Sequence, residues 1–590
     1  MILQALLDYY DILAKAGKIS RPGYCRAGVS FALSLSEGGE LLSAVSLKQD
    51  KQVGKKTVEA PQSLEVPKQV KRSVGISSNF MCDNSGYVLG IDAKGKPERT
   101  RQCFDAFKEL HHKVLDSADS VPAKAVLRFL DAWQPAKAAE CAEVRDSLEA
   151  LTAGGNIVFR VAGDYTQNDP AIRRAWEAYC QPPDDAPVMQ CLVTGRNEPV
   201  ARLHPSIKGV KGGQPTGVSI VSFNARAYES YGRDKQQGLN APVSTYAAFA
   251  YTTALNYLLA DTAHKQTYCD TTVVYWAHTA DLFYSDLANR LIDPPEVDED
   301  SESLADDVFK KLVAGEYVHD DAQQEVIDRN MPFYVLGLAP NAARLSIRFF
   351  LSGSFGQFVN NMLAHHAALE IEHAPQEKKY LPLWRLMQET VSPMSRDKAA
   401  SPLLAGAVLR SIFSDQPYPE LLFQSVMVRV RAERDVSRGK AAIIKAYLIK
   451  KYENIYKEVL TVSLNEEWND KAYLLGRLFA VLEKAQLEVS PGINATIKDK
   501  YFASACATPA NTFAFLLKLN MNHISKMKKD TQKGKLGYYY ENMIAELQNK
   551  IEADDDAYPI HLTLQKQGIF ILGYYHQTKA FYTKKNKEEE

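Results

Sequence analysis

The sequence predicts an α+β fold, in which a mixed α/β N-terminal part with short sheets is followed by an all-α helical C-terminal part. Short β-branched or aromatic runs bounded by Gly, Asn or Asp recur up to about residue 350. Apolar residues at helical spacing lie between these runs and dominate after about residue 354. The 590 residues, of which 46% are hydrophobic and 24% charged, have the composition of a soluble globular chain with roughly two to four domains.

The first predicted element is an amphipathic helix at the start of the chain, where apolar residues recur at helical spacing: Ile2, Leu3, Leu6, Leu7, Tyr10 and Leu13. Asp8, Asp11 and the lack of a basic first segment argue against a signal peptide. Strands are then predicted in residues 85–92, 155–163, 189–195, 217–224 and 271–277. Helices are predicted between them, in residues 102–115, 123–132, 171–180 and 244–260.

The chain is expected to become helical after one more pair of strands, residues 333–339 and 343–350. Pro340 and Asn341 separate these strands and are typical of a turn, so we expect a hairpin or a tight crossover. Helical spacing follows in residues 355–369, 402–413, 419–434, 441–456 and 472–486. We expect a mixed α/β domain over residues 1–352, a helical domain over 353–463 and a C-terminal helical bundle over 464–590. The acidic residues 293–307 are expected to form a surface loop.

The sequence contains no motif that supports catalysis. It has no G-x4-G-K-[ST], G-x-S-x-G or H-E-x-x-H, and the pair His319-Asp320 stands without further spaced ligands. The histidines at 111–112 and 365–366 point about 100° apart on a helix, which favours packed or surface histidines over chelation. Eight scattered cysteines without C-x2-C spacing are typical of a reduced, cytosolic chain. We expect no enzyme activity, no metal or other cofactor, and no membrane span.

Charge is distributed unevenly along the chain. The formal net charge of −1 excludes a uniformly basic nucleic-acid binder but allows local patches. Basic runs occur in residues 51–72, 429–457 and 526–535. Each run alone is typical of a solvated face, but three of them favour at least one contact with a polyanion. Arg344 and Arg348 are four residues apart on a predicted strand, which places them on one face as a phosphate clamp or a solvated surface.

Residues 201–244 are dense in Gly, Asn, Lys, Arg and Tyr. Candidate contacts to nucleic acid in this segment are Lys208, Lys211, Asn224, Arg226 and Tyr231. The cations could meet phosphates, and tyrosine could stack on a base. The alternative interpretation is a pair of turns with tyrosines in the core.

A polar stretch, "KRSVGISSNFMCDNSGYVLG", covers residues 71–90. Asn can contact adenine through two hydrogen bonds, Ser and Gly suit close approach in the minor groove, and Lys71 and Arg72 could fix the register on phosphates. The alternative is a turn with an Asx cap ahead of a strand through Tyr87, Val88 and Leu89.

Several segments together resemble the large subunit of the type I-C CRISPR Cascade complex. They include "VKRSVGISSNFMCDNSGYVLGIDAKGK", "CLVTGRNEPVARLHPSIKGVKGG", "IVSFNARAYESYGR", "NAPVSTYAAFAYTTALNYLL", "GLAPNAARLSIRFF", "YLLGRLFAVLEKAQ", "NATIKDKYFASA" and "GYYHQTKAFYTKKNK". The resemblance spans nearly the whole chain. It is the combination of segments that is specific, and no single one would suffice.

The resemblance implies a non-catalytic, cytoplasmic subunit of an RNA-guided surveillance complex. Its partners would be CRISPR RNA, double-stranded target DNA, the displaced single strand, the backbone, guide-processing and small subunits, and a helicase-nuclease. The subunit would recognise a protospacer-adjacent motif, promote duplex opening and R-loop formation, hold the displaced strand and recruit the helicase-nuclease. Base pairing with the guide carries the long sequence information, so the protein needs only a short motif reader and basic tracks.

The resemblance assigns roles to the basic and polar candidates. Motif recognition is expected first at Lys71, Arg72, Ser77, Ser78, Asn79 and Asn84, with Asn79 at the base edge, and second at Lys208 and Lys211. The displaced strand is expected to contact Arg429, Arg431, Arg438, Lys440, Lys526, Lys528 and Lys529.

Other possibilities remain open from the sequence. One is a metal-dependent nuclease that uses His319 and Asp320, and another is a purely structural scaffold of the ribonucleoprotein. Relatives also make a separate small subunit from an internal start. Because no Met lies between Met427 and Met521, a start near Leu464 would need a non-AUG codon. In that case the last 125 or so residues should be stable as a helical bundle.

Overall fold

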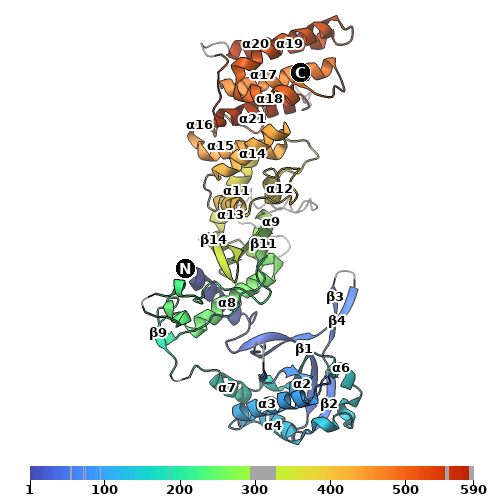
Figure 1. Cartoon of the computed structure of the whole chain (residues 1–590), viewed down its shortest axis with the longest axis vertical. Coiled ribbons are helices and arrows are strands. Elements are labelled where there is room, and N and C mark those ends of the chain that lie inside the picture. Colours follow the sequence, from blue (N-terminus) through green and yellow to red (C-terminus); the bar gives the residue numbers. More distant parts are fainter. Residues whose placement is uncertain are drawn as a thin grey trace. The chain divides into compact units, whose positions relative to one another are not determined.

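The structure of the chain is a computed structural model, which describes residues 1–53, 56–70, 72, 75–93, 95–183, 185–230, 232–292, 327–551 and 557–583. The chain divides into two compact units (Figure 1). Unit 1 combines Met1–Pro205 with Ser222–Ala254, and unit 2 combines Ser206–Val221 with Leu255–Glu590. Each unit has a sheet and a hydrophobic core of its own.

Unit 1 is built on a six-stranded sheet with the order β2-β1-β7-β6, in which β5 also pairs with β1 and β8 with β7. Only β1 and β7 run parallel. The strands are β1 (Tyr24–Leu35), β2 (Leu41–Ser46), β5 (Gln62–Pro67), β6 (Asp83–Asn84), β7 (Asn156–Val161) and β8 (Asp164–Tyr165). Two separate hairpins are β3 (Gln49–Val53) with β4 (Lys56–Ala60) and β9 (Val188–Gln190) with β10 (Asn197–Pro199).

The helices between residues 85 and 179 pack on this sheet around an aromatic core, whereas the N-terminal helix packs against the helix that begins at Thr245. Phe80 stacks on Trp176 with ring centroids 4.8 Å apart, and it lies 4.9 Å from the ring of His111. The helices are α1 (Ile2–Lys15), α2 (Ser85–Val88), α3 (Pro97–Leu115), α4 (Val121–Ala132), α5 (Ala142–Arg145), α6 (Leu148–Thr152), α7 (Pro170–Tyr179) and α8 (Thr245–Ala260), of which α8 continues into unit 2.

His111 is a packed core histidine, as the sequence favoured. Its Nε2 accepts a hydrogen bond from the backbone N–H of Met81 at 3.0 Å, so the proton on Nδ1 is donated to the carbonyl of Phe107 at 2.7 Å. Burial lowers the pKa of His111 to about 3, which keeps the ring neutral. The ring therefore ties the segment before β6 to α3.

Three strand predictions in the first half were wrong or too long. Residues 85–92 hold no strand, because Asn84 caps the short helix α2 directly after the two-residue β6. Residues 189–195 contribute only the end of β9. Residues 217–224 make isolated bridges, from Val218 to Ile207 and from Ser219 to Arg344. The strands from β1 to β5 were not predicted.

Unit 2 begins with an antiparallel sheet of order β11-β12-β13-β14. Its strands are β11 (Lys265–Tyr268), β12 (Thr271–Ala277), β13 (Pro332–Asn341) and β14 (Arg344–Ser354). Every residue of β12 is buried, which explains its unbroken apolar and β-branched run. The predicted hairpin is confirmed, but its turn lies at Ala342 and Ala343, because Pro340 and Asn341 still pair with β14 as the last residues of β13. A register shift between Gly337 and Leu338 puts a bulge into β14.

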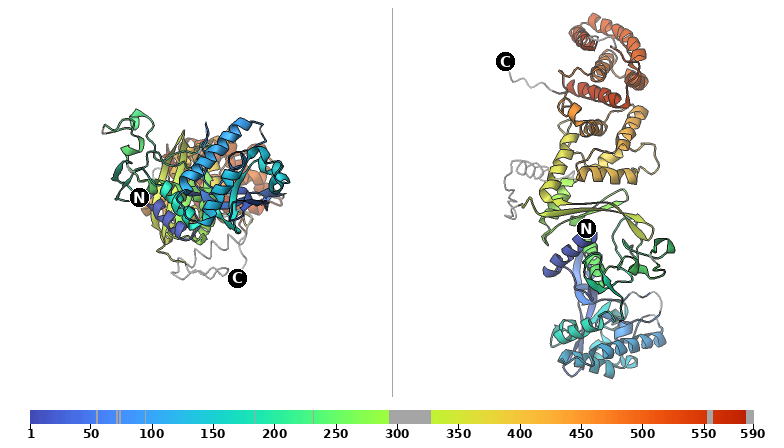
Figure 2. Two further views of the ribbon diagram at one scale, coloured as in Figure 1. Left: turned by 90° about the horizontal axis from the view of Figure 1, so that it is seen from below. Right: turned by 90° about the vertical axis from the view of Figure 1, so that its left-hand side faces the viewer.

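The described residues after Ser354 contain helices and loops only, which confirms the predicted α+β class. In Figures 1 and 2 the helices of unit 2 follow the sheet in layers. They are α9 (Phe283–Ile292), α11 (Phe355–Leu369), α12 (Leu383–Gln388), α13 (Pro402–Phe413), α14 (Glu420–Glu433), α15 (Arg438–Lys451), α16 (Glu453–Tyr456), α17 (Lys471–Val489), α18 (Ile497–Ala507), α19 (Pro509–Lys529), α20 (Gly534–Ile551) and α21 (Leu564–Ala580). One continuous core joins the sheet to α21, and the predicted division at residues 353 and 464 stays a prediction.

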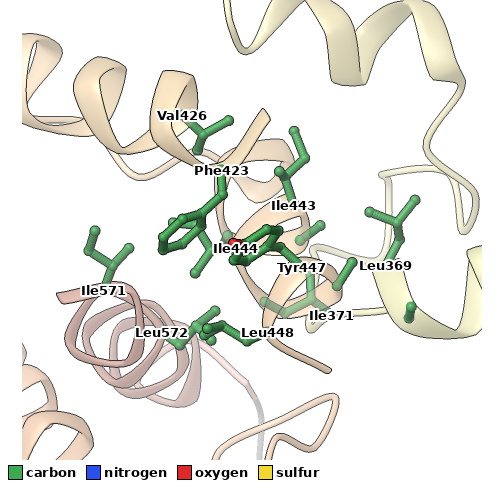
Figure 3. Close-up of a cluster of buried hydrophobic side chains, with 14 of the residues drawn as sticks. Leu369, Ile371, Phe423, Val426, Ile443, Ile444, Tyr447, Leu448, Ile571 and Leu572 are labelled. Carbon is green, nitrogen blue, oxygen red and sulfur yellow. The ribbon is translucent and has the colours of Figure 1, made fainter. Parts of the chain in front are cut away.

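The middle of this core joins α14, α15 and α21 (Figure 3). The rings of Phe423 and Tyr447 stack in parallel with centroids 4.4 Å apart, and Ile571 and Leu572 of α21 lie below them. Offset or stacked aromatic pairs add roughly 0.5–1.5 kcal/mol to the burial of their area. Residues on both sides of the predicted boundary at 464 thus share this part of the core.

Two glycines let α17 and α21 pack backbone against backbone. A Cβ on Gly476 would lie 2.0 Å from the carbonyl oxygen of Phe570, and one on Gly573 would lie 2.2 Å from that of Tyr473. No side chain fits at such distances, so these two positions require glycine for the observed helix separation. The two glycines therefore set the close packing of α17 against α21.

Candidate nucleic-acid interface

Within the polar stretch, Arg72 and residues 75–84 are organised by a single buried carboxylate. Asp83 is 1% exposed and accepts hydrogen bonds from Nη1 of Arg72 at 2.9 Å, from Nη2 of Arg72, and from the backbone N–H groups of Asn79 at 3.0 Å and Asn84 at 2.8 Å. These contacts bring the two ends of the stretch together. The polar residues of this segment therefore mainly stabilise the conformation of the loop.

Arg72 is held on three sides. Its guanidinium lies 3.9 Å from the ring centroid of Tyr87, and its Nε donates to the carbonyl of Ser77 at 2.5 Å. Burial lowers the pKa of the guanidinium, but the hydrogen bonds and charge of Asp83 outweigh burial and raise the pKa above its ordinary value. With 23% of its side chain exposed, Arg72 has little surface left for a phosphate. Lys71 lies outside the described residues.

The other predicted motif residues differ in exposure. Asn79, the expected base reader, is 6% exposed, and its Oδ1 accepts the backbone N–H of Val70 at 2.8 Å. The Oδ1 of Asn84 accepts the N–H of Gly86 at 3.0 Å, which is the Asx cap that the alternative interpretation expected. Ser77 is exposed, and Ser78 is half-buried with its hydroxyl donated to the carbonyl of Asn79 at 2.8 Å. Among the described candidates of this stretch, Ser77 alone has an exposed side chain.

Lys208 and Lys211 stand exposed on a loop whose backbone is tied down. The N–H of Lys208 donates to Oδ1 of Asn256 at 2.8 Å, and the N–H of Lys211 donates to Oγ1 of Thr272 at 3.1 Å. The side-chain amide of Asn256 also donates to the carbonyl of Ser206 at 3.0 Å. A fixed backbone with exposed lysine side chains suits contact with phosphates at defined positions.

The two strand arginines do not form a simple pair. Arg348 is 22% exposed and bonded to Asp270 at 2.9 Å, and the bulge in β14 interrupts the alternation from which a common face with Arg344 was expected. In unit 1, Asn224 and Arg226 are exposed, with Arg226 beginning a short 3-10 turn. Tyr231 lies outside the described residues.

The candidates on α14 and α15 are engaged within the protein. Arg438 is 9% exposed and donates to the carbonyls of Lys378 at 2.5 Å and Lys379 at 2.7 Å. Lys440 is 3% exposed and bonded to Glu433 at 2.5 Å. These side chains brace the start of α15, and the structure gives them no surface for a strand.

The remaining two candidates of this region form contacts along and between helices. Arg429 lies 3.5 Å from Glu433, one turn further along α14. Arg431 has its guanidinium hydrogen-bonded to the side-chain oxygen of Gln567 on α21. A strand on this surface would have to compete with these partners.

Two of the three predicted lysines at the end of α19 have open side chains. Lys526 and Lys529 are exposed, and neither pairs with a carboxylate in the part of the chain that the structure describes. Lys528 is bonded to Glu541 of α20 and lies 4.4 Å from the ring centroid of Tyr538. Tyr538 and Tyr539, each more than half exposed, were missed as candidates, although their position beside the lysine run was visible in the sequence.

Within the described residues, no group of three or more His, Cys, Asp or Glu is arranged to hold a metal ion. The ring of His365 is hydrogen-bonded to Tyr418 at 2.7 Å, and that of His366 to the carbonyl of Leu291 at 3.2 Å, so both are packed histidines. Burial lowers the pKa of His366 to about 4. His319, Asp320 and the acidic residues 293–307 lie outside the described residues.

Cys191 and His204 have separate hydrogen-bond partners. The sulfur of Cys191 accepts backbone N–H groups of Val193 and Thr194 at 3.4 Å and of Ser244 at 3.2 Å. Burial raises the pKa of this thiol, but the N–H groups outweigh burial and lower it below its ordinary value. His204 shares a hydrogen bond of 2.7 Å with the hydroxyl of Tyr251.

The fold and these surfaces define an α+β protein with exposed lysines on an anchored loop and on the end of a long helix. No helix among the described residues has the length and hydropathy needed to cross a bilayer. A family model described as CRISPR-associated protein (Cas_Csd1) matches residues 6–582.

The chain therefore belongs to the Cas_Csd1 family of CRISPR-associated proteins, and proteins of this kind act in CRISPR defence as part of a complex. No curated protein matches the chain. The family assignment agrees with the CRISPR-associated family to which the sequence segments pointed.

Proposed function

We propose that this chain is the non-catalytic large subunit of a type I-C Cascade complex, bound to CRISPR RNA and its partner subunits. In this role it contacts the protospacer-adjacent motif of a DNA duplex, promotes R-loop formation, holds the displaced strand and recruits a helicase-nuclease. The observation that carries the proposal is the family match over residues 6–582. A subunit of this kind works in the cytoplasm and needs no cofactor.

The exposure of the cations supports a refined assignment of the DNA contacts. Lys208 and Lys211 are exposed on an anchored loop, whereas Asn79 and Arg72 are engaged in the shape of residues 72–84. We therefore move the first motif contact to Lys208 and Lys211, with Ser77 as the open residue of the polar stretch. For the displaced strand, Lys526 and Lys529 replace the buried Arg438 and Lys440.

The physical reason for this division is that the guide RNA reads the sequence by base pairing. The protein then has to hold phosphates and inspect a few base pairs, which a small number of well-placed lysines can do. Each phosphate contact should make the affinity depend on salt, because binding releases condensed counterions.

The test is equilibrium binding of the reconstituted complex to a duplex with a correct motif, a duplex with a wrong motif and a pre-opened bubble. The double variant Lys208→Ala/Lys211→Ala should weaken binding to the closed duplex and lower the slope of log K against log salt by about 1 to 2. Lys124→Ala, at an exposed lysine paired with Asp119, is the matched control.

Three results would decide against the assignment. Wild-type slope and discrimination in the double variant would remove Lys208 and Lys211 from the interface. Metal-dependent cleavage of DNA by the purified chain, lost in His319→Ala, would instead favour the nuclease alternative. Normal assembly and normal target binding in every lysine variant would favour a scaffold.

A further inference from the structure

A groove of about 810 Å³ runs between α19 and α20 in unit 2. Its apolar walls include Leu517, Met521 and Ile524 of α19 and Ile544 of α20. Met521 is 71% exposed, so an apolar side chain stands open at the groove. The lining on α19 extends from Ala514 to Lys529, which at 1.5 Å per residue is about 22 Å and matches a few nucleotides of single strand. Figure 1 shows the two helices side by side.

The groove contains one polar atom that the fold leaves without a partner. Asn520 lines the groove and is 6% exposed, yet its Oδ1 accepts no hydrogen bond from any described residue. A buried carbonyl without a donor is costly, so such a group in a folded protein calls for an explanation. A ligand that brings an N–H or O–H donor into the groove would supply the missing partner.

The charge around the groove selects the kind of ligand. Residues 509–551 carry seven lysines but only three carboxylates, namely Asp530, Glu541 and Glu546. Lys518 and Lys529 line the groove with their side chains exposed. The exposed ring of Tyr538 lies beside Lys528, which also lines the groove. Cations, an aromatic ring and apolar walls in one place are the combination with which proteins hold single-stranded nucleic acid.

We propose that this groove binds single-stranded nucleic acid through its bases, with the amide of Asn520 facing a base edge and the lysines on the phosphates. The inference rests on the proposed holding of the displaced strand and adds base contact to it. Unstacked bases present N–H donors on their edges and flat apolar faces, and the groove offers the complement of both. An apolar helix of a partner protein would fill the walls but bring no donor to Asn520 and no negative charge to the lysines.

The test compares bubble duplexes in which the displaced strand is natural, abasic or absent, bound by the reconstituted complex. Base contact predicts that the abasic strand binds the wild type about tenfold more weakly than the natural strand. Asn520→Leu should bind the natural strand more weakly by a similar factor, and its affinity for the abasic strand should equal that of the wild type. Asn522→Leu, an exposed position of the same helix outside the groove lining, should behave as wild type.

A second variant guards against misfolding of Asn520→Leu. Met521→Glu changes an exposed side chain and should also weaken binding of the natural strand only. Equal affinity of wild type for natural and abasic strands would overturn base contact, as would equal losses on both strands in the two groove variants. Failure of Met521→Glu, at an exposed position, to join the complex would assign the groove to a partner protein and also overturn the proposal.

Lysine variants separate this inference from the function on which it rests. If Lys526→Ala/Lys529→Ala binds the natural and abasic strands as the wild type does, holding of the displaced strand by this region fails. The lysine substitutions could instead weaken binding of both strands while Asn520→Leu and Met521→Glu change the affinity for neither. The strand is then held by its phosphates, and only the proposed base contact fails.

Discussion

Replacing Asp83 by Asn tests whether one carboxylate sets the conformation of residues 75–84 and their contact with Arg72. In the structure its two oxygens accept the guanidinium of Arg72 and the backbone N–H groups of Asn79 and Asn84. An amide of nearly the same size keeps one acceptor oxygen and turns the other position into a donor. That donor would face N–H groups that already point toward it, and the charge that balances Arg72 would be gone.

The size of the effect follows from the burial of the pair. Breaking a buried ion pair by removing one partner costs about 3–5 kcal/mol. Because Arg72 retains 23% exposure and can regain water, we expect a smaller loss of local stability, about 2–3 kcal/mol. Since 1.4 kcal/mol corresponds to a factor of ten, amide hydrogens held by this loop should exchange roughly 30 to 150 times faster in Asp83→Asn.

Hydrogen exchange followed by mass spectrometry on peptides covering residues 75–90 measures this directly. The control is Asp119→Asn, which removes an exposed carboxylate paired with Lys124 and should leave exchange in the loop unchanged. Wild-type protection of the Asn79 and Asn84 amides in Asp83→Asn would refute the reasoning. It would mean that the stacking of Phe80 on Trp176 alone determines the conformation of the loop.

Three further predictions concern unit 2. Gly573→Ala should lower the thermal midpoint, because its Cβ would lie 2.2 Å from a backbone oxygen and overpacking costs about 1–3 kcal/mol, whereas Gly534→Ala, with its nearest atom at 3.5 Å, should not. Burial lowers the pKa of Lys445 from 10.5 to about 8. Between these two pKa values the folded chain therefore binds fewer protons than the unfolded chain, so the free energy of unfolding of the wild type should rise with pH. Urea titrations at several pH values should show this rise in the wild type and not in Lys445→Met, and equal pH slopes in the two proteins would contradict it. Arg438→Met should reduce stability in urea without changing affinity for the displaced strand. Lys529→Ala should reduce that affinity without changing stability. Loss of strand binding in Arg438→Met would restore that residue to the interface.

The helices were predictable because their signal is local. Apolar residues at helical spacing are contained within the segment itself, so α3, α11 and α17 were found within a few residues of their bounds. The strand β1 was missed because Ala, Gly and Ser interrupt its apolar run, and because its parallel partner β7 comes more than 120 residues later. Tyr87 and Val88 favoured a strand, but the cap at Asn84 and burial in the core made a helix instead.

The sequence predicted which residue types could contact nucleic acid, but it did not predict which of those side chains are already bonded within the protein. Lysines and arginines were visible in the sequence, whereas their partners were not, since Arg438 is bonded to carbonyls about 60 residues away. Asp83 was not singled out, because its role depends on the return of the chain to Arg72. Asn520 was missed for a similar reason, since an amide without a partner is recognisable only when its surroundings are known.

The packing of α21 bears on any product that begins near Leu464. Such a fragment keeps α17 and α21 together with the glycines that join them, but it lacks α14 and α15. Gly568 of α21 lies against Phe423 and Ile444 in the full chain, and Ile571 and Leu572 are at most 1% exposed there. The shortened protein would therefore expose a hydrophobic surface along its last helix. It would remain in solution only by packing that surface against a neighbouring subunit of the assembly.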